Sequence, residues 1–392
     1  MGKKKIAYIN KDMLIWARGT TPFTSPEDVE SRFNNISAEK LRKWEKGEEL
    51  PSITEAKELA SKYKLPFACF YLSSCPTKKP KQYTDRRTFL GAEYGVMSYE
   101  LWKEIDRIKS DRETLLEYYN EEEINATQLP IISNESSIVD IANIIRKFFD
   151  LPVSFRNKNA YKNSFNYYRL KLESKGIVVA QISEVDLYEM KGISIYEDVF
   201  PIIGINNKDY ERAKTFSLFH ELAHLIRRSS SLCLINDDER NDEEEKICDG
   251  IAAEILMEEN EFKQIAVETY YRFGDWSDIA LNKLADRFGV STVSAFRRLF
   301  DLGMIDKNYY FERYKEINDS FLENIDKIKK DQEGKNVPFY FHVRFINSHG
   351  HLLPKAVISS HYSGRITMGE ACKILNVKSK FFGDLSKAVM VL

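Results

Sequence analysis

Cysteine and histidine are scarce in this chain of 392 residues, which contains five of the first and six of the second. Five cysteines at irregular spacing do not make a disulfide framework, and we therefore expect a reducing, cytoplasmic compartment. No stretch approaches the roughly 18 apolar residues that predict a membrane span, and the first residues lack the apolar core of a secretory signal. A Gly-rich phosphate loop and an internal repeat do not stand out either. These absences argue against a membrane protein, a disulfide-rich secreted domain or a repeat array.

What the chain does contain is enough apolar material for several cores, with 43% hydrophobic and 12% aromatic residues. At this length about two to four domains are expected. The net charge of −2 conceals an asymmetry, because residues 1–90 hold 18 Lys and Arg against 11 Asp and Glu. A basic end on an otherwise acidic chain favours a contact with nucleic acid, although a solvated basic surface would explain the charge equally well.

Short helices with sharp turns are predicted in the N-terminal region. Ser25 is followed by Pro and two acidic residues, which is typical of a helix start. A second helix is expected over 38–46, where it carries Lys40, Arg42 and Lys43. A short helix, a tight turn and a second helix with basic side chains is how a helix-turn-helix presents a recognition helix to the major groove.

The same region resembles the XRE class of helix-turn-helix domains. The resemblance rests on residues 36–72, which read ISAEKLRKWEKGEELPSITEAKELASKYKLPFACFYL and place a Trp-Glu-x-Gly stretch after the recognition helix. It covers roughly residues 10–72 and implies that the N-terminal domain binds duplex DNA. The pair of Asn residues before the turn departs from the family pattern. A helical docking or dimerisation domain without DNA binding is the alternative, and a homodimer is left open.

A Pro- and Lys-rich linker separates this region from further helices, which are predicted over 99–119, 138–149 and 165–172. Two β-rich runs follow, GIVVAQIS at 176–183 and FPIIGINN at 200–207.

The chemistry-bearing residues lie in FSLFHELAHLIRR, residues 216–228. A helix there is apolar nearly all round and is therefore expected to be buried. His220 and His224 are one turn apart and project in the same direction. Because unsatisfied buried polar groups cost about 1–3 kcal/mol each, two imidazoles need partners, and Zn²⁺ accepts neutral imidazole in this geometry. Glu221 would stand beside the open position, as in the H-E-x-x-H arrangement of zinc peptidases. Two histidines satisfied inside a core are the alternative.

A third ligand is expected from a second helix over residues 242–257. Glu245 and Asp249 share a face of this helix with small and apolar residues, so Glu245 is predicted to bind the metal. Asp249 could accept the second N–H of a ligating histidine and fix its tautomer. Cys248 is a rival ligand because thiolate is soft, but its position off this face favours Glu245.

These segments resemble the ImmA/IrrE family of zinc metallopeptidases. The resemblance is carried by FPIIGINNKDYERAKTFSLFHELAHLI and EKICDGIAAEILM. It implies a zincin-like core in which His220, His224 and Glu245 bind Zn²⁺ and Glu221 is catalytic, while Asp249 replaces the usual Asn.

Other positions extend or depart from this likeness. Cys248, Ile251 and Glu258 replace the family's Ala, Phe and Pro. Residues 279–305 resemble the helix-turn-helix-like segment that follows the family's protease core, and DRRTFL resembles the linker of fused XRE and ImmA/IrrE proteins. The family implies cleavage of a helix-turn-helix repressor or antitoxin.

The C-terminal part begins with FYFHVRFINSHGHLL, which alternates like a strand. Its histidines are interpreted as exposed loop residues. Helices are expected after it.

Together, these patterns predict a multidomain, mainly α protein with a small β-sheet. The expected divisions are a DNA-binding domain over 1–75, a linker and long helix over 76–130, a metallopeptidase core over 131–275, a helix-turn-helix-like segment over 276–335 and a small α/β regulatory region over 336–392. The predicted function is Zn²⁺-dependent endopeptidase action on a protein partner, to switch transcription. The substrate is expected to add as a strand along residues 201–206, beside Ile203, Ile205 and Asn206. The alternative is a DNA-binding regulator or antitoxin-like module whose zinc domain senses or scaffolds without cleaving.

Overall fold

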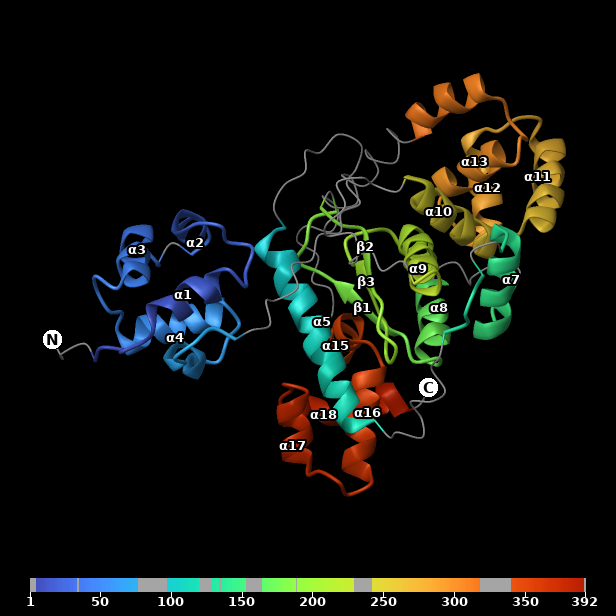
Figure 1. Cartoon of the computed structure of the whole chain (residues 1–392). Helices are drawn as coiled ribbons and strands as arrows, with labels where there is room; N and C mark the ends of the chain where they lie inside the picture. The colour runs from blue at the N-terminus through green and yellow to red at the C-terminus, as the bar shows by residue number, and fades with distance from the viewer. Residues whose placement is uncertain are drawn as a thin grey trace. The chain divides into compact units, whose positions relative to one another are not determined.

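In the part of the chain that the structure describes, the fold is mainly helical with one three-stranded sheet, as expected from the sequence. The computed structural model (Figure 1) describes residues 5–33, 35–76, 97–119, 129–133, 136–152, 164–187, 189–228, 242–317 and 340–390. The predicted linker after residue 76, including DRRTFL, lies outside these residues. The chain divides into two compact units, one formed by 1–84 with 92–106 and the other by 85–91 with 107–392. In the described part of the chain no helix is both long and apolar enough to cross a membrane.

The first unit is a small bundle of short helices. Its elements are α1 (Lys11–Arg18), α2 (Pro26–Arg32), α3 (Ala38–Lys46), α4 (Ile53–Lys62), the 3₁₀ helix η1 (Phe67–Tyr71) and the first turns of α5 (Tyr99–Tyr118). A capping box of Ser25 and Asp28 begins α2, which explains the predicted helix start. Tyr99 stacks on Phe23 at 5.4 Å between ring centroids and meets Phe33 edge-on. The core of this unit therefore includes a residue beyond the predicted 1–75 domain.

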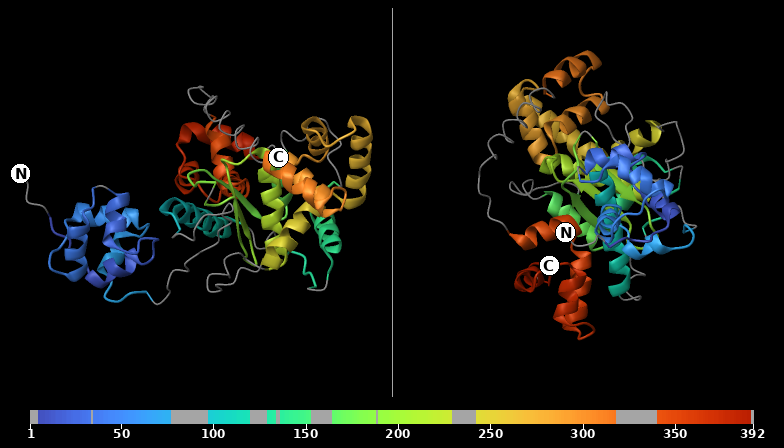
Figure 2. Two further views of the ribbon diagram at one scale, coloured as in Figure 1. Left: turned by 90° about the horizontal axis from the view of Figure 1, so that it is seen from above. Right: turned by 90° about the vertical axis from the view of Figure 1, so that its left-hand side faces the viewer.

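The second unit is built around a three-stranded sheet. Its first elements are α7 (Ile138–Phe149), α8 (Ser164–Glu173), β1 (Val178–Ile182), β2 (Gly192–Ile195), β3 (Ile202–Asn206), α9 (Glu211–Ile226) and α10 (Asp242–Leu256). The strand order is β1-β3-β2, with β1 parallel and β2 antiparallel to β3. Helix α9 packs against β2, β3, α8 and α10, and Figure 2 shows the helices and sheet of this unit from two further directions.

The central position of β3 overturns the predicted substrate strand. Both edges of β3 are paired, for example Ile203 with Val179 on one side and with Ser194 on the other. Asn206 is fully buried, and its side-chain amide donates to the carbonyl oxygens of Val185 and Met190. Ile203, Ile205 and Asn206 therefore belong to the central strand and offer no free edge to a substrate. The edge strand next to β3 on the side opposite β1 is β2.

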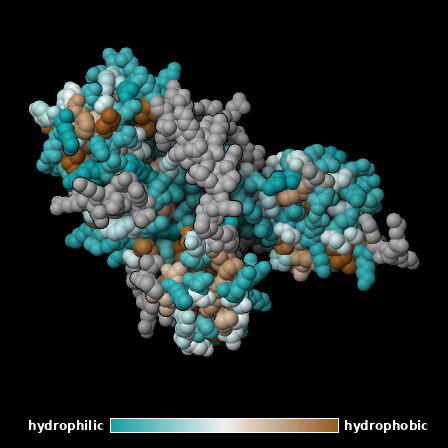
Figure 3. Space-filling view, turned by 180° about the vertical axis from the view of Figure 1, so that it is seen from behind, coloured by the Kyte–Doolittle hydropathy of each residue, from teal (hydrophilic) through white to brown (hydrophobic). Residues whose placement is uncertain are grey.

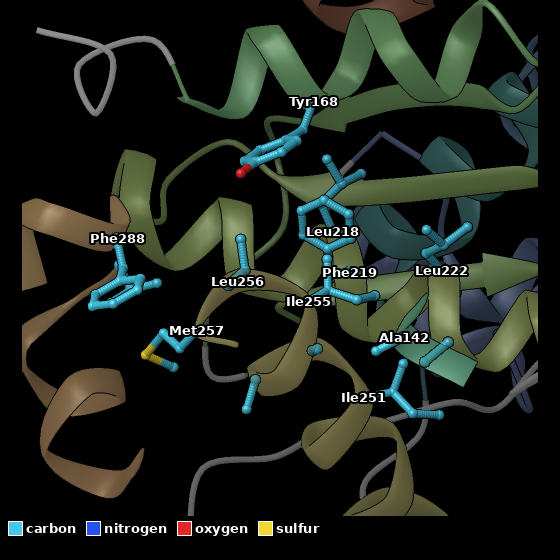
Figure 4. Packing of buried hydrophobic residues seen from close by; sticks show 14 of the residues in the cluster. Ala142, Tyr168, Leu218, Phe219, Leu222, Ile251, Ile255, Leu256, Met257 and Phe288 are labelled. Atoms are coloured by element: carbon cyan, nitrogen blue, oxygen red, sulfur yellow. The ribbon is translucent and has the colours of Figure 1, made fainter. Parts of the chain in front are cut away.

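Helices α9 and α10 share the main hydrophobic core. Figure 4 shows Leu218, Phe219 and Leu222 of α9 among the residues packed with Ile251 of α10 and Ala142 of α7. The same cluster continues into α11 (Glu259–Phe273), α12 (Asp278–Phe288) and α13 (Thr292–Asp301). A turn through Gly289, with a φ of +66°, joins α12 to α13. The core thus fixes the angle at which α9 and α10 meet, and this angle positions the polar residues described below.

One buried ion-pair network joins three of these helices. Glu254 of α10 is 2% exposed and pairs with Arg298 of α13, whose Nε also donates to the Met257 carbonyl at 3.1 Å. Arg146 of α7 donates to the Glu254 carbonyl. A buried carboxylate with two guanidinium neighbours holds the helices in one arrangement, because any other would leave a charge unpaired.

The C-terminal residues differ from the predicted strand and from the predicted α/β character of this region. The expected strand is helix α15 (Phe341–His349), followed by α16 (Leu352–Tyr362), α17 (Met368–Ile374) and α18 (Ser379–Met390), so the described residues 340–390 form no strand. The short alternating run also fits a helix, because Phe341 and Phe345 lie one turn apart and their rings are 5.9 Å apart. Packing of α15 against β1 favours the helix.

The two histidines of the SHGH turn are not loose loop residues. His349 Nδ1 lies 2.7 Å from Asp111 Oδ2, and His351 Nδ1 lies 2.6 Å from Glu173 Oε2. Gly350 between them has a φ of +78°, and a Cβ there would lie 2.8 Å from Glu173 Oε1. We call these two His–carboxylate pairs the SHGH latch, since they join the C-terminal helices to α5 and α8.

Candidate metal centre

Helix α9 carries the two histidines into the interior. Residues 217–226 are all buried, and His220, Glu221 and His224 are each only 1% exposed. The helix is buried all round because β2, β3, α8 and α10 surround it. Three polar side chains at such depth require partners of their own, since burying an unsatisfied group is costly.

The ligand atoms of three residues converge between α9 and α10. The Nε2 atoms of His220 and His224 are 2.9 Å apart. Glu245 places Oε2 at 3.3 Å from His220 Nε2 and Oε1 at 3.3 Å from His224 Nε2. In a tetrahedral zinc site with metal–ligand bonds of about 2.0–2.1 Å, neighbouring ligand atoms are about 3.3 Å apart. The spacing of these donors therefore fits a zinc ion, and only small adjustments would be needed to accommodate it.

The outer nitrogen of His220 is also engaged. Asp249 Oδ1 lies 2.6 Å from His220 Nδ1, while the Asp249 side chain is 58% exposed. When Nδ1–H donates to this carboxylate, Nε2 keeps its lone pair for a metal. Asp249 thus stands in the geometry expected of an orienting group, and it is not one of the three residues whose ligand atoms converge.

Cys248 lies on the far side of the His224 ring. Its Sγ is 3.6 Å from His224 Nδ1, the nitrogen that faces away from His220 and Glu245. Burial raises the pKa of the Cys248 thiol, although the neighbouring His224 lowers it. The sulfur is therefore placed beside a ligand and not at the third ligand position, for which it was a rival.

The electrostatics of the site favour a cation. Burial lowers the pKa of His224, but hydrogen bonds with Cys248 and Glu245 and the charge of Glu221 oppose it and bring the pKa to about 11. These groups therefore stabilise positive charge at His224 strongly enough to outweigh its desolvation. A divalent ion satisfies the same demand and displaces the proton as it binds.

An ion pair sets the position of Glu245 on α10. Glu244 directly precedes Glu245, and its two carboxylate oxygens accept hydrogen bonds of 2.6 and 2.7 Å from the guanidinium of Arg227, just after α9. A two-point pair of this kind fixes orientation as well as distance. With Glu244 held by Arg227, the next residue points toward the histidines.

Gly192, at the start of β2, is a site residue that the sequence analysis missed. A Cβ at this position would lie 2.7 Å from Glu221 Oε1 and 2.9 Å from Glu221 Cγ. Only glycine leaves room for the carboxylate against the strand. The one available signal was a glycine that opens the short apolar run GISI.

The predicted DNA-contact residues lie on α3 with exposed side chains, and each is paired with a carboxylate. Lys40 is 3.4 Å from Glu55, Arg42 pairs with Glu27, and Lys43 is 3.2 Å from Glu39. Residues 5–76 carry 11 Lys and Arg against 10 Asp and Glu, so this unit is nearly neutral. Most of the basic excess counted over 1–90 lies outside the described residues.

One comparison with known proteins bears on the centre. A family model described as Peptidase_M78, IrrE N-terminal-like domain, matches residues 173–300. The matched segment runs from the last residue of α8 into α13 and contains His220, Glu221, His224 and Glu245. It supports a peptidase-type domain in this part of the chain. The match does not reach the first unit, so DNA binding stays a prediction.

Proposed function

We propose that this protein is a zinc-dependent endopeptidase, acting in the cytoplasm, that cleaves a helix-turn-helix repressor or antitoxin and carries its own DNA-binding unit. The observation that supports this most is the convergence of His220, His224 and Glu245, with the buried carboxylate of Glu221 next to them on α9. The family match over residues 173–300 supports the same class of enzyme.

Each residue of the centre has a defined role in this proposal. Zinc, when bound, polarises the peptide carbonyl and lowers the pKa of a bound water to about 7. Glu221 takes the proton of the attacking water as general base and later delivers it to the leaving amine. His220, His224 and Glu245 hold the ion, and Asp249 keeps the His220 ring in the required tautomer.

The substrate segment would add to the sheet beside β2. Peptides commonly bind by pairing with a sheet edge, where main-chain hydrogen bonds hold them in an extended form. All four residues of β2 are buried, so the groups that cover this edge would have to give way to the substrate. Gly192 begins β2 and lies against Glu221, so a peptide paired with this strand passes close to the catalytic carboxylate. In this proposal the substrate still binds as an added strand, but it pairs with β2 and not with β3.

The first unit would bind duplex DNA through α3. The ion pairs of Lys40, Arg42 and Lys43 involve exposed groups, and such pairs stabilise a protein only weakly, so phosphates can replace the carboxylates. Cleavage of a bound regulator near its operator would then change transcription.

The experiment that tests the enzyme compares wild type with Glu221→Gln. Each is loaded with zinc and incubated with the product of the neighbouring gene as the candidate substrate. We expect one or a few defined fragments with wild type and none with the variant, because Gln cannot accept the proton. Equal zinc content in the two proteins is the control. Zinc binding without cleavage by wild type would favour a non-cleaving regulator.

A further inference from the structure

Two consecutive residues of α10 face the outer nitrogens of the two histidines. Asp249 Oδ1 lies 2.6 Å from His220 Nδ1, and Cys248 Sγ lies 3.6 Å from His224 Nδ1. Glu245, one turn earlier, faces both inner Nε2 atoms at 3.3 Å. Residues within one turn of α10 therefore contact both ring nitrogens of His220 and of His224.

The chemistry of a ligating imidazole defines what Cys248 has to do. A histidine that binds a cation through Nε2 carries its proton on Nδ1, and that N–H needs an acceptor. The sulfur of Cys248 lies within hydrogen-bond range of this nitrogen, inside the protein and 0% exposed. Sulfur is a weak acceptor, whereas the Asp249 carboxylate that faces His220 is a strong one.

A second contact orients the thiol. Cys248 Sγ lies 3.9 Å from Glu244 Oε1, and Glu244 is held by Arg227 through two hydrogen bonds. The thiol can therefore donate its hydrogen to Glu244 and accept the His224 Nδ1–H on its lone pair. In this assignment the hydrogen bonds run from Arg227 through Glu244 and Cys248 to His224, and each group has a consistent role as donor or acceptor. The thiol is in its neutral form.

We propose that Cys248 is a positioning residue that holds the His224 ring with Nε2 directed toward His220 and Glu245. The inference rests on the proposed metal centre, and it implies that the two histidine rings are oriented with different strength. His220 is held by a carboxylate and His224 by a thiol, so His224 is the more weakly oriented ligand. The zinc affinity of the centre depends on Cys248 although sulfur does not bind the ion.

The test measures zinc affinity in the full-length protein by competition with a chelator. Cys248→Ala removes the acceptor and should weaken zinc binding about 10–100-fold, the usual effect of losing a group that orients a ligand. Cys248→Ser should keep most of the affinity, because a hydroxyl can accept from His224 and donate to Glu244. Cys372→Ala on α17 is the matched control and should bind zinc as wild type does. Circular dichroism of the metal-free proteins checks that all four are folded.

A second measurement separates positioning from direct ligation. In the cobalt-substituted protein we expect no thiolate-to-metal charge-transfer band. Such a band in wild type that is lost in Cys248→Ala would make the cysteine a ligand and overturn the inference, as would wild-type zinc affinity in a folded Cys248→Ala protein. These readouts do not depend on peptide cleavage. A wild-type protein that binds zinc without cleaving anything contradicts the proposed enzyme and leaves this inference standing, whereas one that binds neither ion overturns both.

Discussion

The carboxylate of Glu221 lies against the backbone of Gly192, so close that a Cβ on the glycine would come within 2.7 Å of Glu221 Oε1. The start of the edge strand β2 and the catalytic candidate on α9 are thus fitted to one another.

The first prediction follows from this contact. Gly192→Ala should displace the Glu221 carboxylate and lower kcat for cleavage about 100-fold, since misplacing a group by about 1 Å can cost that much. Zinc affinity should stay close to wild type, because the ligands are on other residues. Steady-state kinetics and chelator competition on the same samples provide the measurement. Gly383→Ala is the control, because its added methyl meets nothing within 4 Å. Unchanged cleavage by Gly192→Ala would mean that Glu221 is not held by this strand.

The second prediction concerns the metal. Glu245→Ala removes a ligand and should abolish tight zinc binding, whereas Asp249→Ala should weaken it about 10–100-fold. Metal content after dialysis, followed by chelator competition, distinguishes the two effects. Glu243→Ala, two positions before Glu245 on the same helix, serves as the control. If Asp249→Ala loses more zinc than Glu245→Ala, the two roles are reversed.

The third prediction concerns DNA. The full-length protein should bind duplex DNA with an affinity that falls steeply as salt rises, because phosphate contacts release counterions. Joint replacement of Lys40 and Lys43 by Ala should weaken binding and reduce the salt slope by about 2, since each phosphate contact contributes about 0.9 to it. Lys57→Ala on α4 is the control. Fluorescence anisotropy at several salt concentrations gives the slope. Absence of binding at low salt would identify the first unit as a docking domain.

The fourth prediction tests the SHGH latch. His351→Ala removes a hydrogen bond to Glu173, which is 3% exposed, and should lower the free energy of unfolding by about 1.5–3 kcal/mol. His342 of α15 has no such bond to a buried carboxylate among its described contacts. The control His342→Ala should therefore change stability little. Denaturant unfolding gives both values. Equal effects would show that the latch contributes nothing beyond helix packing.

Predictions from the sequence were most accurate where the helical spacing of apolar residues agreed with the capping residues at the ends of the helix. The helix predicted over 138–149 has those bounds in the structure, because a capping serine precedes it and its apolar residues recur at helical spacing. The histidine helix was also predictable, since two imidazoles in an apolar segment are unusual. The approach of Glu245 to these rings followed from the period of its helix.

Other features depended on contacts that no local pattern records. Strand β2 has only four residues, all buried, so it shows no alternation, and its omission made β3 look like an edge. Residues 341–349 fit two periods, and packing against β1 decided between them. The pairing of Cys248 with His224 and of Gly192 with Glu221 depends on how α9 meets its neighbours. Sequence spacing could indicate which residues share a helix face, but not which atoms of another element oppose them.

The SHGH latch also has a consequence for the order of folding. His349 meets Asp111 across 238 positions of the chain, and His351 meets Glu173 across 178. Closing loops of this length costs entropy that only an already assembled surface can offset, so such contacts form late. The C-terminal helices therefore have their docking site only once α5, α8 and β1 are in place. During synthesis on a ribosome, Asp111 and Glu173 emerge well before the histidines that pair with them.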